Sequence, residues 1–149
     1  MAYVVEVDQS NMVEESGDTY LAFSNDISWA IRVPFKAKQA GFEALRARRK
    51  TKKTAKLMLF AACIFLLIED HLDQLQRITI DNEYAGRGDD VKAFLLRHIW
   101  EVNPSFDPWD IETTSIGKKS PAHIKAWSAR AEGKAEQTVT TREILDLVG

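Results

Sequence analysis

The run LMLFAACIFLLI, residues 57–68, is the feature that most limits how this chain can fold. All twelve residues are apolar, whereas a helix needs about twenty such residues to cross a membrane. A helix that is apolar on every side must be covered by other elements on several sides. We therefore expect residues 57–68 to form the central, buried helix of a folded domain and not a membrane span.

Length and composition are those of one ordinary domain. The chain has 149 residues, of which 45% are hydrophobic and 28% charged, with only 7 Gly and 4 Pro, and this excludes a largely disordered or fibrous protein. A chain of this size can bury roughly two thirds of its unfolded surface around one core. We expect a single domain over residues 1–149, with residues 132–149 as a C-terminal helical extension.

Cysteine usage and the first residues indicate the compartment. The only cysteine, Cys63, lies inside the apolar run, which excludes an internal disulfide framework and a thiolate zinc cluster. The start, MAYVVEVDQS, lacks the basic and long apolar regions of a secretory signal. A cytoplasmic protein is expected.

Charge is unevenly distributed along the chain. The net charge of -2 argues against generic, charge-driven binding to nucleic acid. Residues 46–56, RARRKTKKTAK, nevertheless hold seven basic residues and no acid, which makes a local positive patch.

Hydrophobic patterning predicts alternating strands and helices. Three strands come first, and a helical segment of over thirty residues follows from about Gly41, with its basic part as the place for a break. Ser120 and Pro121 form an N-cap and first helical position, and Thr140 with Glu143 forms a capping box for a short last helix. The predicted strands are residues 3–8, 19–24, 28–35, 77–84 and 109–116, and further helices cover residues 89–102 and 121–133.

This order, with Asp8 in the first strand and Asp81 in the fourth, resembles the ribonuclease H-like superfamily. The segment ITIDNEYAG, residues 78–86, is similar to the fourth strand of ribonucleases H, and VEVDQSN, residues 5–11, stands at the place of the first-strand Asp motif. The resemblance covers roughly residues 3–131. It implies an α/β fold with a mixed five-stranded sheet, three antiparallel strands followed by parallel ones, flanked by helices.

The resemblance implies a metal-dependent nuclease that hydrolyses phosphodiester bonds in RNA, RNA/DNA hybrid or branched DNA with Mg²⁺ or Mn²⁺. Asp8 and Asp81 are the first candidates for metal ligands, because each ends an apolar strand where a carboxylate is costly unless it is paired, liganded or solvated. Glu83 shares the face of Asp81 and replaces or supports it in the alternative ligand set, since resolvases of the superfamily use a Glu on this strand.

His123 has two interpretations. It lies in the first turn of the helix predicted over residues 121–133, which is where the superfamily places its final metal ligand. Asp8, Asp81 and His123 therefore resemble the Asp-Asp-His ligand set of Piwi domains. The other interpretation is a surface histidine packed against Trp127, four residues further along the helix. His71 and His98 are interpreted as structural.

Several basic residues are expected at the edge of the sheet that carries Asp8 and Asp81, where they would contact phosphates. The candidate nucleic-acid-binding residues are Arg46, Arg48, Arg49, Lys50, Lys52, Lys53, Lys118 and Lys119.

Two departures from the superfamily pattern favour an alternative function. The ligand Glu near the start of the long helix aligns with Met58 or Leu59, neither of which can bind magnesium, and Gln9 replaces the Gly that commonly follows the first-strand Asp. The alternative is a catalytically inactive module that binds nucleic acid or a protein partner. A small-molecule enzyme on an unrelated α/β fold ranks last, because the chain has no Gly-rich phosphate loop and no nucleophile motif. The sequence leaves the oligomeric state open.

Overall fold

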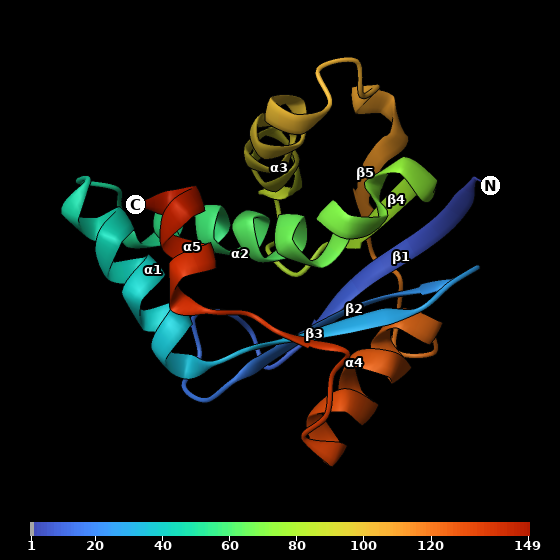
Figure 1. Cartoon of the computed structure of the whole chain (residues 1–149), viewed down its shortest axis with the longest axis horizontal. Helices are drawn as coiled ribbons and strands as arrows, with labels where there is room; N and C mark the ends of the chain where they lie inside the picture. Colours follow the sequence, from blue (N-terminus) through green and yellow to red (C-terminus); the bar gives the residue numbers. More distant parts are fainter. Residues whose placement is uncertain (1) are drawn as a thin grey trace.

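A computed structural model describes residues 2–149 as a mixed β-sheet with helices on both faces (Figure 1). The strands are β1 (Tyr3–Ser10), β2 (Thr19–Asn25), β3 (Trp29–Val33), β4 (Leu75–Asp81), β5 (Ile111–Thr114) and β6 (Gln137–Thr138). Their order in the sheet is β5-β4-β1-β2-β3-β6. β1, β2 and β3 pair antiparallel in turn, whereas β4 and β5 run parallel to β1 and β6 runs parallel to β3. The predicted α/β class with helices flanking a mixed sheet is confirmed.

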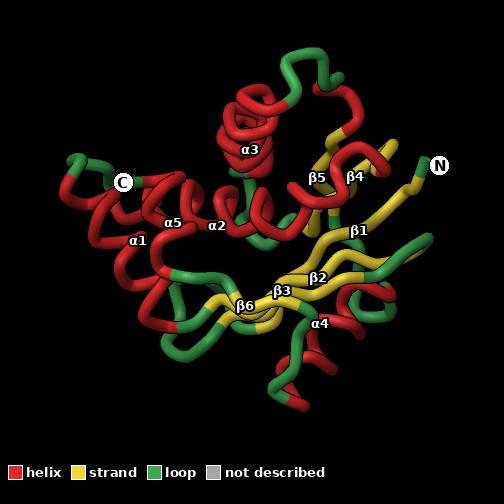
Figure 2. The backbone as a smooth tube through the Cα atoms, viewed as in Figure 1, coloured by secondary structure: helices red, strands yellow, loops and turns green. Residues whose placement is uncertain are grey.

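The helices form two unequal layers. They are α1 (Phe35–Ala47), α2 (Lys52–Ile68), α3 (Gly88–Val102), α4 (Pro121–Glu132) and α5 (Thr141–Val148). Figure 2 shows α4 by itself on one side of the sheet and the other helices on the opposite side. The main core lies under the larger layer, and a smaller cluster of Tyr20, Ala22, Ala30, Ala126 and Ala129 lies under α4.

Alternation along β1 decides which layer each side chain meets. Val5 and Val7 are fully buried in the main core. Glu6 and Asp8 point to the other face, where they contact Ser120 and His123 of the α4 region. An acidic pair on one face and a valine pair on the other is what the two-residue period of a strand produces.

The apolar run forms most of α2, as predicted. Every residue from Leu59 to Ile68 is at most 4% exposed. α2 packs against α1, α3 and α5 as well as against β2 and β3, which explains why it can be apolar all round. No helix within residues 2–149 has the length and apolar character to cross a membrane, in line with the prediction for this run.

The long helical segment is divided in two. α1 starts at Phe35, with Pro34 between it and the end of β3, and not near Gly41. It stops at Arg48, Arg49 takes the left-handed conformation with φ of 64°, and the Thr51 side chain accepts a hydrogen bond from Thr54 N to begin α2. The break therefore lies in the basic part, where the sequence allowed one.

The predicted count of five strands is wrong, because β6 adds a sixth. β6 has only two residues, too few for an alternating pattern to be recognised in the sequence. It places Gln137 opposite Ile31 and Thr138 opposite Arg32. The segment expected as a purely helical extension thus contributes both this strand and α5, which packs against α1 and α2.

Candidate metal centre

Asp8 and Asp81 lie side by side on neighbouring parallel strands. The register pairs Glu6 with Thr79 and Val7 with Ile80, so the next residue of each strand is an aspartate. Because the two strands run in the same direction, both carboxylates fall at the carboxyl edge of the sheet, where α/β proteins place their ligands.

Glu83 joins these aspartates just beyond β4. The backbone turns sharply at this point, since Glu83 N donates to the backbone oxygen of Asp81 at 2.9 Å. Within residues 2–149, one carboxylate oxygen from each of Asp8, Asp81 and Glu83 lies within 4.8 Å of the others. The structure therefore brings together both candidates for the fourth-strand ligand.

Asp8, Asp81 and Glu83 are called here the carboxylate cluster, and the charge of Asp8 disfavours ionisation of the other two. Asp8 is 2% exposed. Burial, followed by the neighbouring Asp8, raises the pKa of Glu83 to about 9. Burial also raises the pKa of Asp81, and its hydrogen bond from Ile116 N only partly opposes this effect. An all-oxygen donor set whose charges repel fits a hard divalent cation, which would relieve the repulsion.

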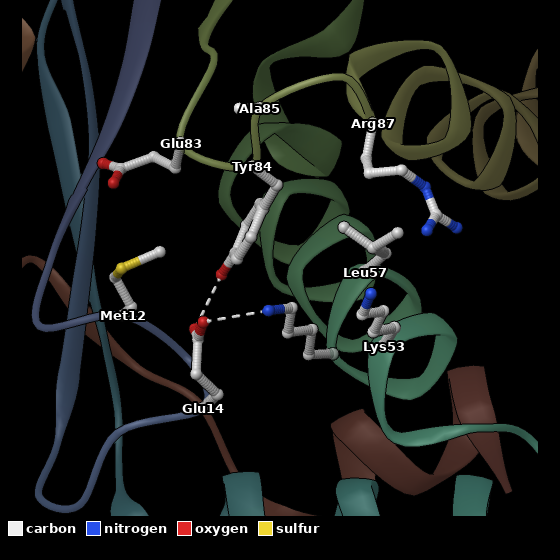
Figure 3. Close-up of a pocket in the computed structure, with 9 residues that line it drawn as sticks. Met12, Glu14, Lys53, Leu57, Glu83, Tyr84, Ala85 and Arg87 are labelled. Atoms are coloured by element: carbon white, nitrogen blue, oxygen red, sulfur yellow. Dashed lines mark hydrogen bonds and ion pairs between the residues drawn. The ribbon is translucent and has the colours of Figure 1, made fainter.

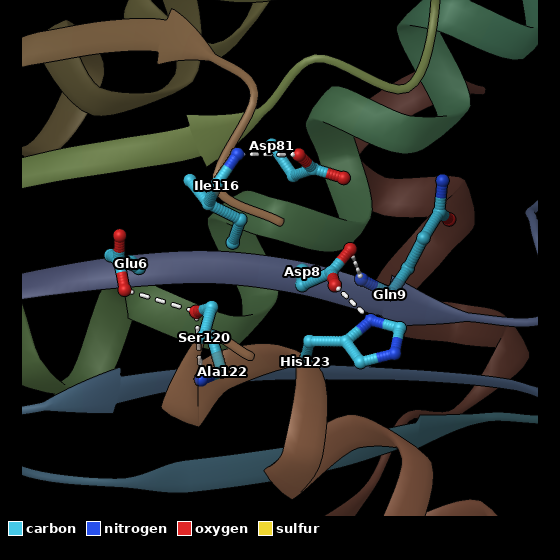
Figure 4. Close-up of polar contacts among 8 residues, drawn as sticks. All are labelled: Glu6, Asp8, Gln9, Asp81, Ile116, Ser120, Ala122 and His123. Carbon is cyan, nitrogen blue, oxygen red and sulfur yellow. Dashed lines mark hydrogen bonds and ion pairs between the residues drawn. The ribbon is translucent and has the colours of Figure 1, made fainter. Parts of the chain in front are cut away.

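Hydrogen bonds hold two of the carboxylates in place (Figure 4). Asp8 Oδ1 accepts from Gln9 N at 2.8 Å, and Asp8 Oδ2 lies 2.8 Å from His123 Nδ1. Asp81 Oδ1 accepts from Ile116 N, in the loop after β5, at 3.0 Å. The cluster is thus tied both to α4 and to the segment that leads into it.

His123 touches the cluster without being part of the group of mutually close ligand atoms. Its position follows from the start of α4: Ser120 Oγ accepts from Ala122 N, as the predicted N-cap requires, and donates to Glu6 Oε1. This pins the first turn of α4 to β1, and His123 then reaches Asp8. Trp127 is 61% exposed, and the imidazole of His123 contacts Asp8.

The other histidines lie away from the cluster. His71 packs between the rings of Phe23 and Trp29, with centroid distances of 5.2 and 4.9 Å. His98 packs on Phe65, and burial lowers its pKa.

No family model, curated protein or solved structure matches the chain.

A cavity of about 360 Å³ opens beside Glu83 (Figure 3). Lys53, Lys56 and Leu57 of α2 line one wall, and Arg87 and Met12 contribute elsewhere. Inside it, Tyr84 donates its hydroxyl hydrogen to Glu14 Oε1 at 2.9 Å, and Lys56 Nζ lies 3.6 Å from Glu14 Oε2. The cavity therefore joins the carboxylate cluster to two lysines.

Only part of the basic run, residues 46–56, lies at this cavity. Lys53 lines the cavity, and Lys52 lies nearby in a second hollow that Lys53 and Glu14 also line. Arg46 donates to the backbone oxygen of Lys50, and Arg48 donates to that of Val148 in α5. Arg49 is exposed in the turn between α1 and α2. The run is not one continuous surface beside the cluster.

Lys118 and Lys119 are exposed in the loop between β5 and α4. This loop starts beside the cluster, since Ile116 N binds Asp81.

The alignment of Met58 or Leu59 with the missing helix carboxylate is not matched by the structure. Met58 lines a different cavity, together with Arg48 and His98. Leu59 is fully buried and faces α1, where a Cβ on Gly41 would lie 3.0 Å from its Cδ1. The α2 residues that share a cavity with residues of the cluster are Lys53, Lys56, Leu57 and Phe60, so the helix supplies cations and apolar side chains there.

Sequence reasoning missed several neighbours of the cluster. Tyr84 lay inside the fourth-strand motif, yet nothing marked its hydroxyl as a donor to Glu14. Phe60 supports the Tyr84 ring at 5.3 Å, and burial raises the pKa of the Tyr84 hydroxyl. Glu14 is in the irregular segment after β1, where no periodicity predicts which way a side chain points.

Proposed function

We propose that the chain is a ribonuclease H-like, divalent-metal-dependent nuclease acting on RNA, RNA/DNA hybrid or branched DNA. The observation that carries the proposal is the convergence of Asp8, Asp81 and Glu83 at the carboxyl ends of two adjacent parallel strands. Close carboxylates, of which Asp8 is buried, are costly unless they are paired or bind a cation, and oxygen ligands are those that Mg²⁺ prefers.

The arrangement of the elements supports the same proposal. Three antiparallel strands are followed by α1 and α2, into which the expected long helix is divided, and then by the parallel strand β4, α3, the parallel strand β5 and α4. This is the order on which the sequence resemblance rests, and it brings the two motif aspartates to neighbouring positions.

Each residue of the centre has a proposed role. Asp8, Asp81 and Glu83 would hold Mg²⁺ or Mn²⁺. The cation would supply charge to stabilise the scissile phosphate and lower the pKa of a water molecule. His123 and Gln9 N fix the Asp8 carboxylate, and Ile116 N fixes that of Asp81.

Phosphate contacts are proposed for the lysines of the adjacent cavity. Lys53 and Lys56 lie on the α2 wall of the space that Glu83 also lines. Lys56 is shared with Glu14, whereas Lys53 has no acidic partner among residues 2–149. Lys53 is thus the better placed of the two to neutralise a phosphate.

Cleavage assays with aspartate variants test the proposal. Labelled single-stranded, hybrid and junction substrates are incubated with Mg²⁺ or Mn²⁺. Asp8→Asn and Asp81→Asn should abolish cleavage, because a neutral amide replaces a charged ligand oxygen. Asp73→Asn, at an exposed position in the turn after α2, is the matched control and should cleave like the parent. Parent activity that survives in both site variants would refute the mechanism.

The second candidate is a catalytically inactive module of the same fold that binds nucleic acid or a protein partner. The observation in its favour is the α2 wall, where Lys53, Lys56 and Leu57 offer no carboxylate to the cluster. Absence of cleavage on every substrate, together with salt-sensitive binding that Lys52→Ala and Lys53→Ala weaken, would favour this candidate.

A further inference from the structure

α4 presents its large apolar side chains to solvent and its small ones to the sheet. The residues of α4 that are buried are Ala122, Ala126 and Ala129. Ile124 is 53% exposed and Trp127 is 61% exposed. Isolated apolar residues on a surface are common, but the indole of Trp127 and the side chain of Ile124 leave α4 with apolar surface that a partner can cover.

A single stripe of this helix leads away from the carboxylate cluster. His123, Trp127 and Arg130 are spaced at i, i+4 and i+7, so they follow one another along one face. His123 contacts Asp8 at the start of the stripe. Trp127 is one turn further, about 6 Å along the axis, and Arg130 is exposed about one turn beyond it.

The segment that carries the stripe is rich in basic residues. Residues 117–135 contain five basic residues and one acidic residue, although the whole chain has a net charge of -2. Lys125 is neutralised by Glu136 at 2.7 Å. Lys118, Lys119 and Arg130 are exposed and form no ion pair within residues 2–149. Unpaired cations in the same segment as an exposed indole suit a polyanion with aromatic groups.

We infer that the α4 stripe of His123, Trp127 and Arg130 holds an unpaired segment of the nucleic-acid substrate and leads it to the carboxylate cluster. This inference rests on the proposed nuclease function and narrows its substrate. Trp127 stacks on a base, which requires a base that is free of its duplex neighbours. Arg130, Lys118 and Lys119 contact the phosphates on either side. The substrate therefore has a single-stranded portion at α4.

Binding measurements test this inference separately from catalysis. Fluorescence anisotropy of labelled single-stranded and duplex oligonucleotides is measured in a chelator, so that metal-dependent cleavage does not occur. Trp127→Ala should weaken single-strand binding about tenfold and leave duplex binding nearly unchanged. Trp127→Phe should retain most of the affinity. Arg130→Ala should weaken binding a few fold. The slope of log affinity against log salt concentration should become shallower by about one, as expected for the loss of one phosphate contact.

Trp109→Ala is the matched control. Trp109 is 81% exposed but lies in the turn before β5, next to Lys92, and it should not affect binding. Thermal unfolding verifies that each variant is folded.

The outcomes separate this inference from the proposed function. Parent-like binding and cleavage by Trp127→Ala would overturn the α4 inference and leave the nuclease proposal intact. Equal losses with single-stranded and duplex ligands would overturn the unpaired-substrate claim. A parent dimer that Trp127→Ala and Ile124→Ala dissociate in sedimentation, without loss of nucleic-acid affinity, would show that the stripe contacts a second copy. A parent that neither binds nor cleaves any nucleic acid would overturn both.

Discussion

His123 Nδ1 lies 2.8 Å from Asp8 Oδ2, which links the first turn of α4 to the end of β1 across 115 positions of sequence. The contact joins the helix on one face of the sheet to the most buried carboxylate of the cluster. Because Asp8 is 2% exposed, the imidazole replaces hydrogen bonds that water cannot supply there. The orientation of the principal candidate ligand thus depends on α4.

Loss of this contact should destabilise the protein. His123→Ala leaves one oxygen of a buried carboxylate without its imidazole partner, and we expect a loss of about 1–3 kcal/mol in the free energy of unfolding. His123→Gln, whose amide can donate to Asp8, should recover part of the loss. Urea denaturation measures the effect. The neighbouring Ile124→Ala, at a 53% exposed position, should change little, and equal losses in the two alanine variants would contradict the role of the contact.

Stability of the metal-free protein should depend on the charge of Glu83. Its pKa is raised from an ordinary value of 4.5 to about 9, so between these values the folded state keeps a proton that the unfolded state has lost. The free energy of unfolding then falls as the pH rises through this window. Glu83→Gln removes this dependence and should stabilise the protein by about 1–2 kcal/mol at pH 7, a value reduced for partial solvent screening.

Thermal unfolding in a chelator at several pH values checks this prediction. The Tm advantage of Glu83→Gln should be near zero at about pH 4, where both states are protonated, and should grow toward pH 9. A constant difference between the two curves would show that Glu83 titrates normally.

Divalent metal should raise the Tm of the parent protein. Metal that binds only the folded state at about a hundredfold above its Kd adds about 2.7 kcal/mol, which corresponds to a rise of roughly 5–10 °C for a domain of this size. Asp81→Asn should lose most of this rise, whereas the exposed Asp73→Asn should keep it, and excess chelator should reverse it. A similar rise in all three proteins would place the metal elsewhere.

Features with a local cause were predicted correctly from the sequence. The apolar run forms α2, Ser120 caps α4, and the capping box of Thr140 and Glu143 opens α5. Each depends on residues within one or two turns. The approach of Asp8 to Asp81 was expected from the order of the elements, since Asp81 ends β4 and Asp8 lies near the end of β1, to which β4 is parallel.

Features that depend on tertiary placement were not predictable. β6 forms because residues 137–138 pair with the edge of β3, and a segment of two residues is too short to show the alternating pattern of a strand. Arg48 belongs to a basic run, yet it turns toward Val148 O at the end of α5. Glu14 reaches Tyr84 and Lys56 from an irregular segment. The sequence shows the charge of these residues but not where their side chains point in the fold.

A charge placed inside α2 should unfold the domain far more readily than the same charge on another helix. Ala62 is fully buried in the centre of α2, and Asp at this position would be ionised in an apolar surrounding without a partner or would fold only in its protonated form. We expect Ala62→Asp to lower the free energy of unfolding by about 3–5 kcal/mol. Ala93→Asp, at an exposed position of α3, makes the same chemical change and should cost under about 1 kcal/mol, through helix propensity alone. The urea midpoints of the two variants give the comparison, and near-equal midpoints would contradict the central position of α2 in the core.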